Sequence, residues 1–546
     1  MPSSALSAPA AAVRFGRTAR RGVAVLAAVA TLAAVAGCAT TPTGSSPVRV
    51  GWTDPVPALD PALATDPVAA ALLFELYPTL VESDGASLEV TPGIAAEAGF
   101  TDAAEYTVVL QPGLQFANGD DLTASDVVFS FERQLALEVP GGAWRQLGNL
   151  TSVEAVDETT VVFHLATDDD ATFPFVLAGV AGLVLDEEVF FADTATDDAD
   201  IVAAQAFAGP YTIADDEAEW GDRVPLQPFD GYAGGRPAAS EIDLRFGTAA
   251  DLAGDLASGS LDVLTGVEVD ADAVALLADD SAIDLVRAGA GQLRGLQFDF
   301  ARMPFGTRTE EADADAAEAV RRAIADALDR AALASTIGGN WLATSDGYLP
   351  LGLPGFGAPL DAVGDGSGGP DLELAASDLE RAGIETPLEI EIHVVPETLG
   401  GPALAEAQAI ATQLEASDLF RVTVTEHTVE EFVDARAAGE VGIVLAGIQP
   451  LSLDPAAYLT PFSSASARSS ALGFANETVD SRIAGLATEL DPEVREELLA
   501  SAQQAIAAAL PALATTQSVR LVFSRSTVDT PRLADSVPLE LGSLRR

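Results

Sequence analysis

Patterns typical of strands and of helices follow one another along almost the whole chain. Runs rich in β-branched and aromatic residues predict strands at 48–52, 106–110, 159–165, 223–229, 241–246, 388–395 and 518–524. Runs with apolar residues at helical spacing predict helices that begin at 67 and 124, and others over 311–335, 372–384 and 496–513. This mixture predicts an α/β fold with mixed sheets. At roughly 100–200 residues per domain, 546 residues are enough for two to four domains.

Acidic residues far outnumber basic ones, and this argues against some classes of partner. The chain has 83 Asp and Glu but only 28 basic residues, all of them Arg, so its formal charge is −55. Because phosphate binding needs clustered basic side chains, we expect no nucleic-acid partner. The hydrophobic content of 48% is that of a chain that folds around a core. The single Cys excludes a disulfide framework and a Cys-based zinc site.

The N-terminal segment has the pattern of an export signal. Four Arg and no acidic residue precede an apolar run over 22–36, which is shorter than the roughly 20 residues of a membrane span. The run ends in VAGC at 35–38, which resembles the lipobox of bacterial lipoproteins. The resemblance implies that residues 1–37 are a signal peptide and that Cys38 is lipidated. Residues 38–47 are small and polar and predict a flexible tether. The alternative is an ordinary signal peptide that happens to contain a Cys.

Side chains suited to covalent chemistry are few and scattered. The three His residues, His164, His393 and His427, have no other His or Cys at the spacing of a metal site. The sequence contains no Gly-x-Ser-x-Gly motif, no Walker loop and, without Lys, no Ser-x-x-Lys motif. The glycines of 364–369 fit a dinucleotide-binding pattern but follow no predicted strand, so they predict a solvated loop. We therefore expect no catalytic residue, no metal site and no cofactor.

One segment carries a recognisable family signature. Residues Glu105–Arg133 read EYTVVLQPGLQFANGDDLTASDVVFSFER and resemble the signature of the family 5 bacterial extracellular solute-binding proteins. The physical reading is consistent with it, because Thr123 is placed to cap a helix and Asp126 lies three residues on. Four apolar side chains in and before this helix are expected to bury together: Phe116, Leu122, Val127 and Phe131.

Weaker motifs follow in family order over nearly the whole mature chain. They include Leu59-Asp60-Pro61, Gly209-Pro210-Tyr211, Ser258-Gly259-Ser260-Leu261-Asp262-Val263 and Asp454-Pro455. The resemblance implies a two-lobed α/β clamshell of the periplasmic-binding-protein type II kind, with an extra subdomain inserted in the first lobe. On that pattern, lobe I comprises 46–82, 205–290 and 516–546, the insert comprises 83–204, and lobe II comprises 291–515.

The resemblance also implies which segments line the ligand. The first segment follows the motif Asp60-Pro61 and lies at the start of a predicted helix, where an anionic group is favoured. The second segment precedes the pair Asp454-Pro455. Their residues are Thr65, Asp66, Gly447, Ile448 and Gln449. The alternative is that neither segment contacts a ligand, the first being only a helix cap and the second only an internal strand. Peptide-binding members often have an Asp at the position of Leu451, where it pairs with the peptide amine. Because a buried ammonium needs a partner, either another acid substitutes or the ligand is a blocked peptide, an oligosaccharide or another small solute.

These observations give one leading hypothesis and two alternatives. We expect a lipid-anchored substrate-binding component of an ABC importer, which captures a peptide or similar small solute between two lobes and presents it to a membrane permease. Such a protein is not an enzyme, and we expect it to act as a monomer at the extracellular face of the cytoplasmic membrane. The alternatives are an exported hydrolase, which needs a nucleophile–base pair or paired carboxylates in its cleft, and a surface receptor lipoprotein without transport.

Overall fold

A computed structural model gives the fold of residues 47–546 as one compact unit. The residues that it describes are 46–53, 57–65, 67–83, 87–214, 222–266, 269, 271–278, 280–337, 342–400, 403–466, 472–530 and 540–546. The predicted signal peptide, Cys38 and Asp66 lie outside these residues.

The largest sheet of this unit is a mixed sheet of eleven strands. Its order is β15-β14-β16-β12-β17-β11-β1-β10-β9-β8, with β13 paired to β17. The strands are β1 Val48–Trp52, β8 Tyr211–Ile213, β9 Arg223–Pro228, β10 Ile242–Phe246, β11 Val263–Gly266, β12 Ile283–Phe298, β13 Leu342–Thr344, β14 Leu388–Val394, β15 Phe420–Glu426, β16 Ile443–Ile448 and β17 Ala512–Arg525. The predicted α/β class with a mixed sheet is therefore confirmed.

Two further sheets and the helices complete the unit. A separate antiparallel sheet has the order β4-β5-β7-β6, from β4 Ala95–Asp102, β5 Glu105–Leu110, β6 Leu150–Ala155 and β7 Thr160–Leu165, and a small one pairs β2 Val81–Glu82 with β3 Thr91–Pro92. The helices of the first half of the chain are α2 Pro67–Leu76, α3 Ala124–Leu137, α4 Phe173–Ala178, α5 Asp198–Ala204, α6 Ala249–Ser258 and α7 Ala271–Ala278. Those of the second half are α8 Ala314–Asp326, α9 Arg330–Ile337, α10 Leu372–Arg381, α11 Pro396–Leu399, α12 Ala403–Ala416, α13 Val429–Ala438, α14 Ala456–Leu459, α16 Glu477–Thr488 and α17 Pro492–Ala509.

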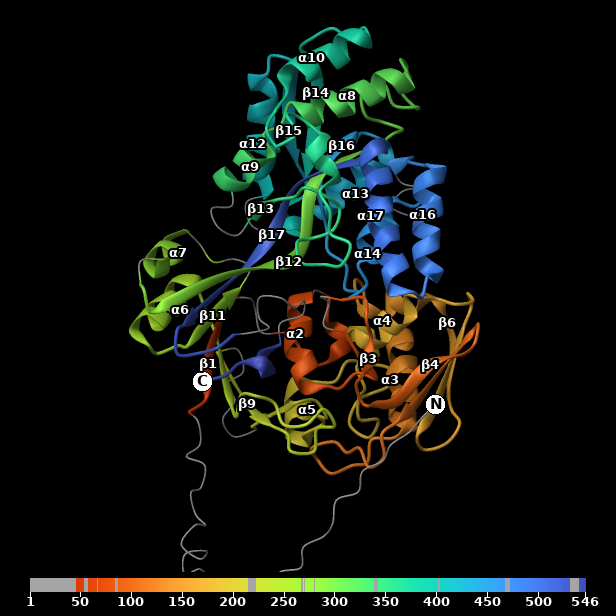
Figure 1. Cartoon of the computed structure of the whole chain (residues 1–546), viewed down its shortest axis with the longest axis vertical. Helices are drawn as coiled ribbons and strands as arrows, with labels where there is room; N and C mark the ends of the chain where they lie inside the picture. The colour runs from red at the N-terminus through yellow and green to blue at the C-terminus, as the bar shows by residue number, and fades with distance from the viewer. Residues whose placement is uncertain are drawn as a thin grey trace, which may run out of the picture. The chain divides into compact units, whose positions relative to one another are not determined.

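Two long strands, β12 and β17, run through both parts of the large sheet. They pair with each other from Ile283↔Arg525 to Gln297↔Ala512. At one end β17 also pairs with β11, and at the other end β12 also pairs with β16. Figure 1 shows these two strands side by side, running from the region of β11 to the region of β16. They therefore join a half of the sheet built on β1, β10 and β11 to a half built on β14 and β16.

Each half of the sheet has its own apolar core. The first core packs β1 and α2 together with the β4–β7 sheet and α3, and it includes Phe116, Leu122, Val127 and Phe131, as expected from the sequence. The second core lies among α8, α10, α12, β14, β16 and α17. A smaller third core lies under α6 and α7 and takes Leu521 and Phe523 from β17. The crossing strands thus contribute to more than one core.

Two predicted helices are shorter than expected, and local chemistry explains both. The predicted helix 311–335 is two helices, because the Asp329 carboxylate accepts a hydrogen bond from the Ala332 N–H and starts α9 anew. The predicted helix 496–513 ends at Ala509, because Leu510 is left-handed (φ 49°) and Pro511 has no N–H to continue the ladder. Residues 512 and 513 belong instead to β17. None of the helices in the described residues has the length and apolarity of a membrane span.

Candidate ligand-binding site at the crossing strands

The first predicted ligand segment is held by a buried ion pair. Asp60 caps a short turn, Pro61–Leu63, by accepting a hydrogen bond from the Ala62 N–H. Both Asp60 oxygens also bind the guanidinium of Arg133, at 2.9 Å from Nη1 and 2.6 Å from Nη2. Thr65 follows this turn as an exposed residue. The ion pair fixes the chain just before Thr65, and the role of Thr65 toward a ligand stays a prediction.

The second predicted segment lies directly against the crossing strands. Gly447 and Ile448 end β16 and pair with Arg294 and Leu293 of β12. A Cβ built on Gly447 would lie 3.0 Å from the Leu399 side chain, so this position has room only for glycine without a shift. Gln449 follows the strand, and the part-buried Leu451 lies in the connection to α14.

The connection after Leu451 touches both halves of the sheet. Leu453 packs against the first core. Asp454, which is 2% exposed, forms an ion pair of 2.7 Å with Arg495 of α17, although burial raises the pKa of its carboxyl. Arg495 in turn lies over the ring of Phe175 in α4, with its guanidinium carbon 5.2 Å from the ring centroid. The predicted ligand segment is therefore continuous with a contact between helices α17 and α4.

Sequence reasoning missed the polar residues of the crossing strands. Thr515, Thr516, Gln517 and Ser518 form a polar run inside β17, and every one of them is at most 4% exposed. The Gln517 side chain donates to the Thr344 carbonyl at 3.0 Å and accepts from the Leu351 N–H at 2.8 Å. Four consecutive polar residues between apolar strand residues were a usable signal, because buried polar side chains need partners.

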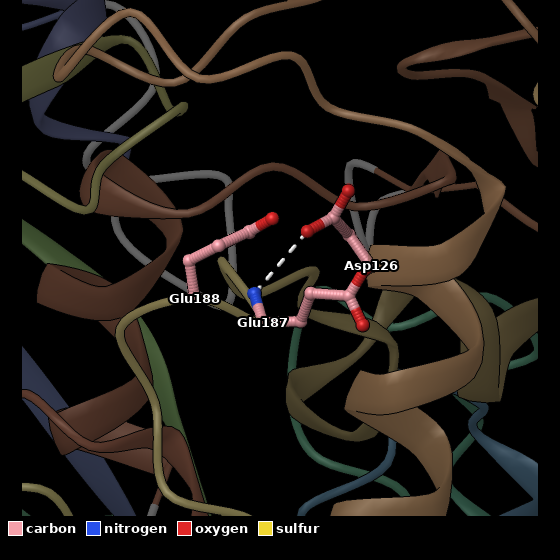
Figure 2. A group of neighbouring side chains, drawn as sticks. All are labelled: Asp126, Glu187 and Glu188. Carbon is pink, nitrogen blue, oxygen red and sulfur yellow. Dashed lines mark hydrogen bonds between the residues drawn. The ribbon is translucent and has the colours of Figure 1, made fainter.

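One group of three carboxylates has the spacing of a metal site. Within the described residues, Asp126, Glu187 and Glu188 bring ligand atoms within 4.8 Å of one another. Figure 2 shows the Glu187 N–H donating to the Asp126 carboxylate, at 3.2 Å. The other Asp126 oxygen accepts from the Thr123 N–H, which completes the predicted capping box of α3. The hydrogen bonds from the Thr123 and Glu187 N–H groups account for the burial of the Asp126 carboxylate. We therefore interpret this group of carboxylates as part of a helix cap.

Two of the three His residues meet in the fold although 34 residues separate them. His393 Nδ1 and His427 Nε2 lie 2.9 Å apart, a hydrogen-bond distance. Burial lowers the pKa of His393, which is 3% exposed. The third, His164, lies on the β4–β7 sheet beside Glu105 and Glu154. The pair His393–His427 is thus a contact between β14 and the residue that follows β15, in a place that sequence spacing did not indicate.

Two cavities in the described residues lie away from the predicted ligand segments. One of about 770 Å³ is lined by the end of α2, by Leu453 and by five acids: Glu75, Glu82, Glu89, Asp529 and Glu540. The other, of about 430 Å³, lies between the β4–β7 sheet and the start of α17. Neither is lined by Thr65 or by 447–451. A small cavity of about 20 Å³ is lined by Ile448 together with Leu293 and Arg294 of β12. The crossing strands and the end of β16 stay the predicted ligand site.

A mixed sheet with two halves that share two long crossing strands matches the fold of the periplasmic-binding-protein type II class. Residues 89–470 match the model of the bacterial extracellular solute-binding proteins, family 5 Middle, and the chain belongs to this family.

Relatives and solved structures agree with this assignment. The chain is 28% identical over 218 residues to the probable D,D-dipeptide-binding periplasmic protein DdpA of Escherichia coli, covering 39% of this chain and 42% of that protein. It therefore spans about two-fifths of the length of this curated relative. HbpA2 from Haemophilus parasuis superposes with a TM-score of 0.75 at 20% identity, over 91% of this chain and 99% of that one. A Pseudoalteromonas dipeptide-binding protein in complex with Met-Leu superposes with a TM-score of 0.65 at 18% identity, over 92% of this chain and 100% of that one.

Proposed function

We propose that this protein is the lipid-anchored substrate-binding component of an ABC importer. It captures a peptide or similar small solute between two lobes and presents it to a membrane permease. The observation that carries the proposal is membership of an extracellular solute-binding family, together with two sheet halves joined by crossing strands. The protein acts as a monomer outside the cytoplasm, held to the membrane by lipid on Cys38.

In this proposal the lobes follow the two large cores. Lobe I comprises 46–82, 205–290 and 516–546, with 83–204 inserted, and lobe II comprises 291–515. The separate β4–β7 sheet supports an insert, although its side chains share the first core with β1 and α2. The separate second core supports lobe II as a body that can rotate as a unit. Lobe closure around a solute then shifts the population toward the closed state that a permease reads.

The proposed ligand contacts are Thr65, Asp66, Gly447, Ile448 and Gln449. The pairing of Gly447 and Ile448 with β12 supports the second segment, because it places these two residues beside a crossing strand. Main-chain hydrogen bonds at a strand end hold peptides without selecting side chains, and Gly447–Ile448 is such a strand end. Leu451 supplies no carboxylate for a peptide amine, so another acid pairs with the amine or the peptide is blocked.

Peptide is the proposed ligand class because of what the relatives bind. The relative from Escherichia coli is a probable D,D-dipeptide-binding protein, and the Pseudoalteromonas structure holds Met-Leu. No covalent step is part of the proposal, in contrast to the alternative of an exported hydrolase.

Mass spectrometry of small molecules released from the purified protein tests this function. Protein that is purified without a denaturing step and then denatured is expected to release peptides at up to one per chain, in agreement with one interlobe site. A released intact sugar would contradict peptide as the ligand class, while solute binding would stand. Conversion of added peptides to shorter products by the purified protein would favour the hydrolase instead. Recovery of no solute, with no binding of any peptide added afterwards, would contradict peptide capture as the function.

A further inference from the structure

The cavity of about 430 Å³ beside the β4–β7 sheet has the size of a site for a small molecule. Pockets that bind small molecules typically measure about 300–1,000 Å³. Residues 98–100 of β4, an edge strand of that sheet, form one wall, and we call the cavity the β4 cavity. Much of the remaining lining is apolar or aromatic and includes Pro92, Tyr106, Pro174, Phe175 and Leu490.

Direct contacts join the two walls of the β4 cavity. The Ala171 N–H, just before α4, donates to the Ala487 carbonyl of α16 at 2.9 Å. The Arg495 guanidinium of α17 lies over the ring of Phe175, which is 3% exposed. Leu88, which also lines the cavity, packs against the second core. These contacts fix the distance between the sheet on one side and α16 and α17 on the other.

Aromatic rings form the wall on the side of the sheet. Phe100 and Tyr106 lie edge to face, with ring centroids 5.0 Å apart and planes at 88°. Tyr106 makes a second edge contact with Phe173, at 5.6 Å between centroids. Aromatic pairs prefer such edge-to-face or offset arrangements, so an aromatic ring in the cavity can pack against Phe100 in the same way.

Two hydrogen-bond donors that line the β4 cavity lack an acceptor. The Nε of Arg495 is buried without a partner among the described residues, although Nη2 pairs with Asp454 at 2.7 Å. Tyr106 is 5% exposed, and its hydroxyl forms no hydrogen bond within the part of the chain that the structure describes. Because buried donors normally have a partner, both indicate room for a ligand that carries an acceptor.

The charges around the β4 cavity argue against an ionic ligand. Glu89 and Glu489 also line it, and Arg495 is the only basic residue in its described lining. The Arg495 charge is already compensated by Asp454. A buried anion would therefore lie among carboxylates without a free counter-ion, and a buried cation would meet the guanidinium. Since a buried charge without a partner is costly, the cavity favours a neutral molecule.

We propose that the β4 cavity is a second binding site, separate from the predicted solute site, for a neutral aromatic compound with a carbonyl group. The ring packs against Phe100 and Tyr106, and the carbonyl accepts hydrogen bonds from Arg495 Nε and from the Tyr106 hydroxyl. Neither Thr65 nor 447–451 lines this cavity, so the inference does not depend on the identity of the transported solute.

Fluorine NMR of the full chain with para-fluoroacetophenone tests the ligand class. We expect saturable binding of this neutral ketone. The anion para-fluorobenzoate has the same ring, and we expect it to bind about tenfold more weakly, because its charge has no free counter-ion in the cavity. No saturable binding of the ketone up to its solubility limit would overturn the proposal. Binding of the benzoate as tight as that of the ketone would overturn the assignment to neutral ligands.

Ala98→Leu and the matched control Ala155→Leu test the location. Ala98 is exposed and lies on the same face of β4 as Phe100, so a leucine there extends into the space beside that ring. Ala155 is an exposed alanine of β6, at the opposite edge of the same sheet. We expect Ala98→Leu to weaken ketone binding about tenfold and Ala155→Leu to leave it unchanged. Equal affinities of the two variants would overturn the site.

Tyr106→Phe and a competition experiment complete the test. Tyr106→Phe keeps the ring and removes one donor, so we expect about fivefold weaker ketone binding, and unchanged binding would contradict the role of the hydroxyl. An excess of the solute released from the purified protein should not displace the ketone. Displacement would place the ketone in the solute site and overturn a separate site. The solute-release experiment tests the proposed function alone, so failure of one proposal leaves the other standing.

Discussion

Asp60→Ala is expected to lower the free energy of unfolding by about 3–5 kcal/mol. Asp60 and Arg133 are fully buried, and two hydrogen bonds join the Arg133 guanidinium to the Asp60 carboxylate, which neutralises its charge. Removal of Asp60 leaves the Arg133 charge without a counter-ion and also frees the Thr196 N–H, which donates to Asp60 at 2.8 Å. Urea denaturation curves of the two chains would measure the difference. Since the pair joins the segment before Thr65 to α3, the first core should loosen with it.

Asp230→Ala is the control for this prediction. Asp230 pairs with Arg236 at 2.9 Å, but both side chains are exposed, at 84% and 62%. An exposed pair typically contributes about 1 kcal/mol or less, because water and salt screen it. A loss at Asp60 no larger than the loss at Asp230 would contradict the view that burial makes the first pair indispensable.

We compare the unfolding free energy of the Glu75→Gln variant with that of the natural chain. This difference is expected to be about 3 kcal/mol more favourable to the variant at pH 8 than at pH 4.5. Burial raises the pKa of Glu75 to about 7, from an ordinary value of 4.5. A carboxyl with a raised folded-state pKa contributes its full share of stability below pH 4.5. That share is lost as the pH rises toward 7, because the unfolded chain ionises first. Gln stays neutral and still accepts the hydrogen bond that the Gly542 N–H gives to Glu75 at 3.0 Å.

The measurement compares unfolding free energies of the two chains at several pH values, so that all other titrations cancel. Glu89→Gln is a suitable control, because Glu89 lines the same cavity as Glu75 but is exposed. It serves as the reference for removal of one acid at the same cavity. A Glu75→Gln chain whose stability relative to the natural chain is the same at pH 4.5 and pH 8 would contradict a raised pKa of Glu75 in the folded chain.

Local patterns in the sequence predicted much of the fold. The Thr123 cap and Asp126 three residues on gave the start of α3 correctly, because a capping box depends only on neighbours in sequence. The strand at 48–52 was also correct, as was the burial of Phe131. The helix over 496–513 was too long, because the apolar residues 512 and 513 fit a helix and a strand equally well.

The candidate site was harder to predict, because it depends on pairs that are distant in sequence. Gln517 and Thr344 are 173 residues apart, and neither stands in a motif. The family resemblance selected Gly447 and its neighbours, and the structure shows only that this segment lies against β12. Asp66 lies outside the described residues, so its role stays a prediction. Thr65 is exposed, and its role also stays a prediction.

The most direct test of the account is small-angle X-ray scattering of the protein with and without its released solute. If two lobes close around a solute by bending at the crossing strands, saturation should lower the radius of gyration, and removal of the solute should restore it. The same radius of gyration in both states, at proven saturation, would contradict lobe closure as the means of binding.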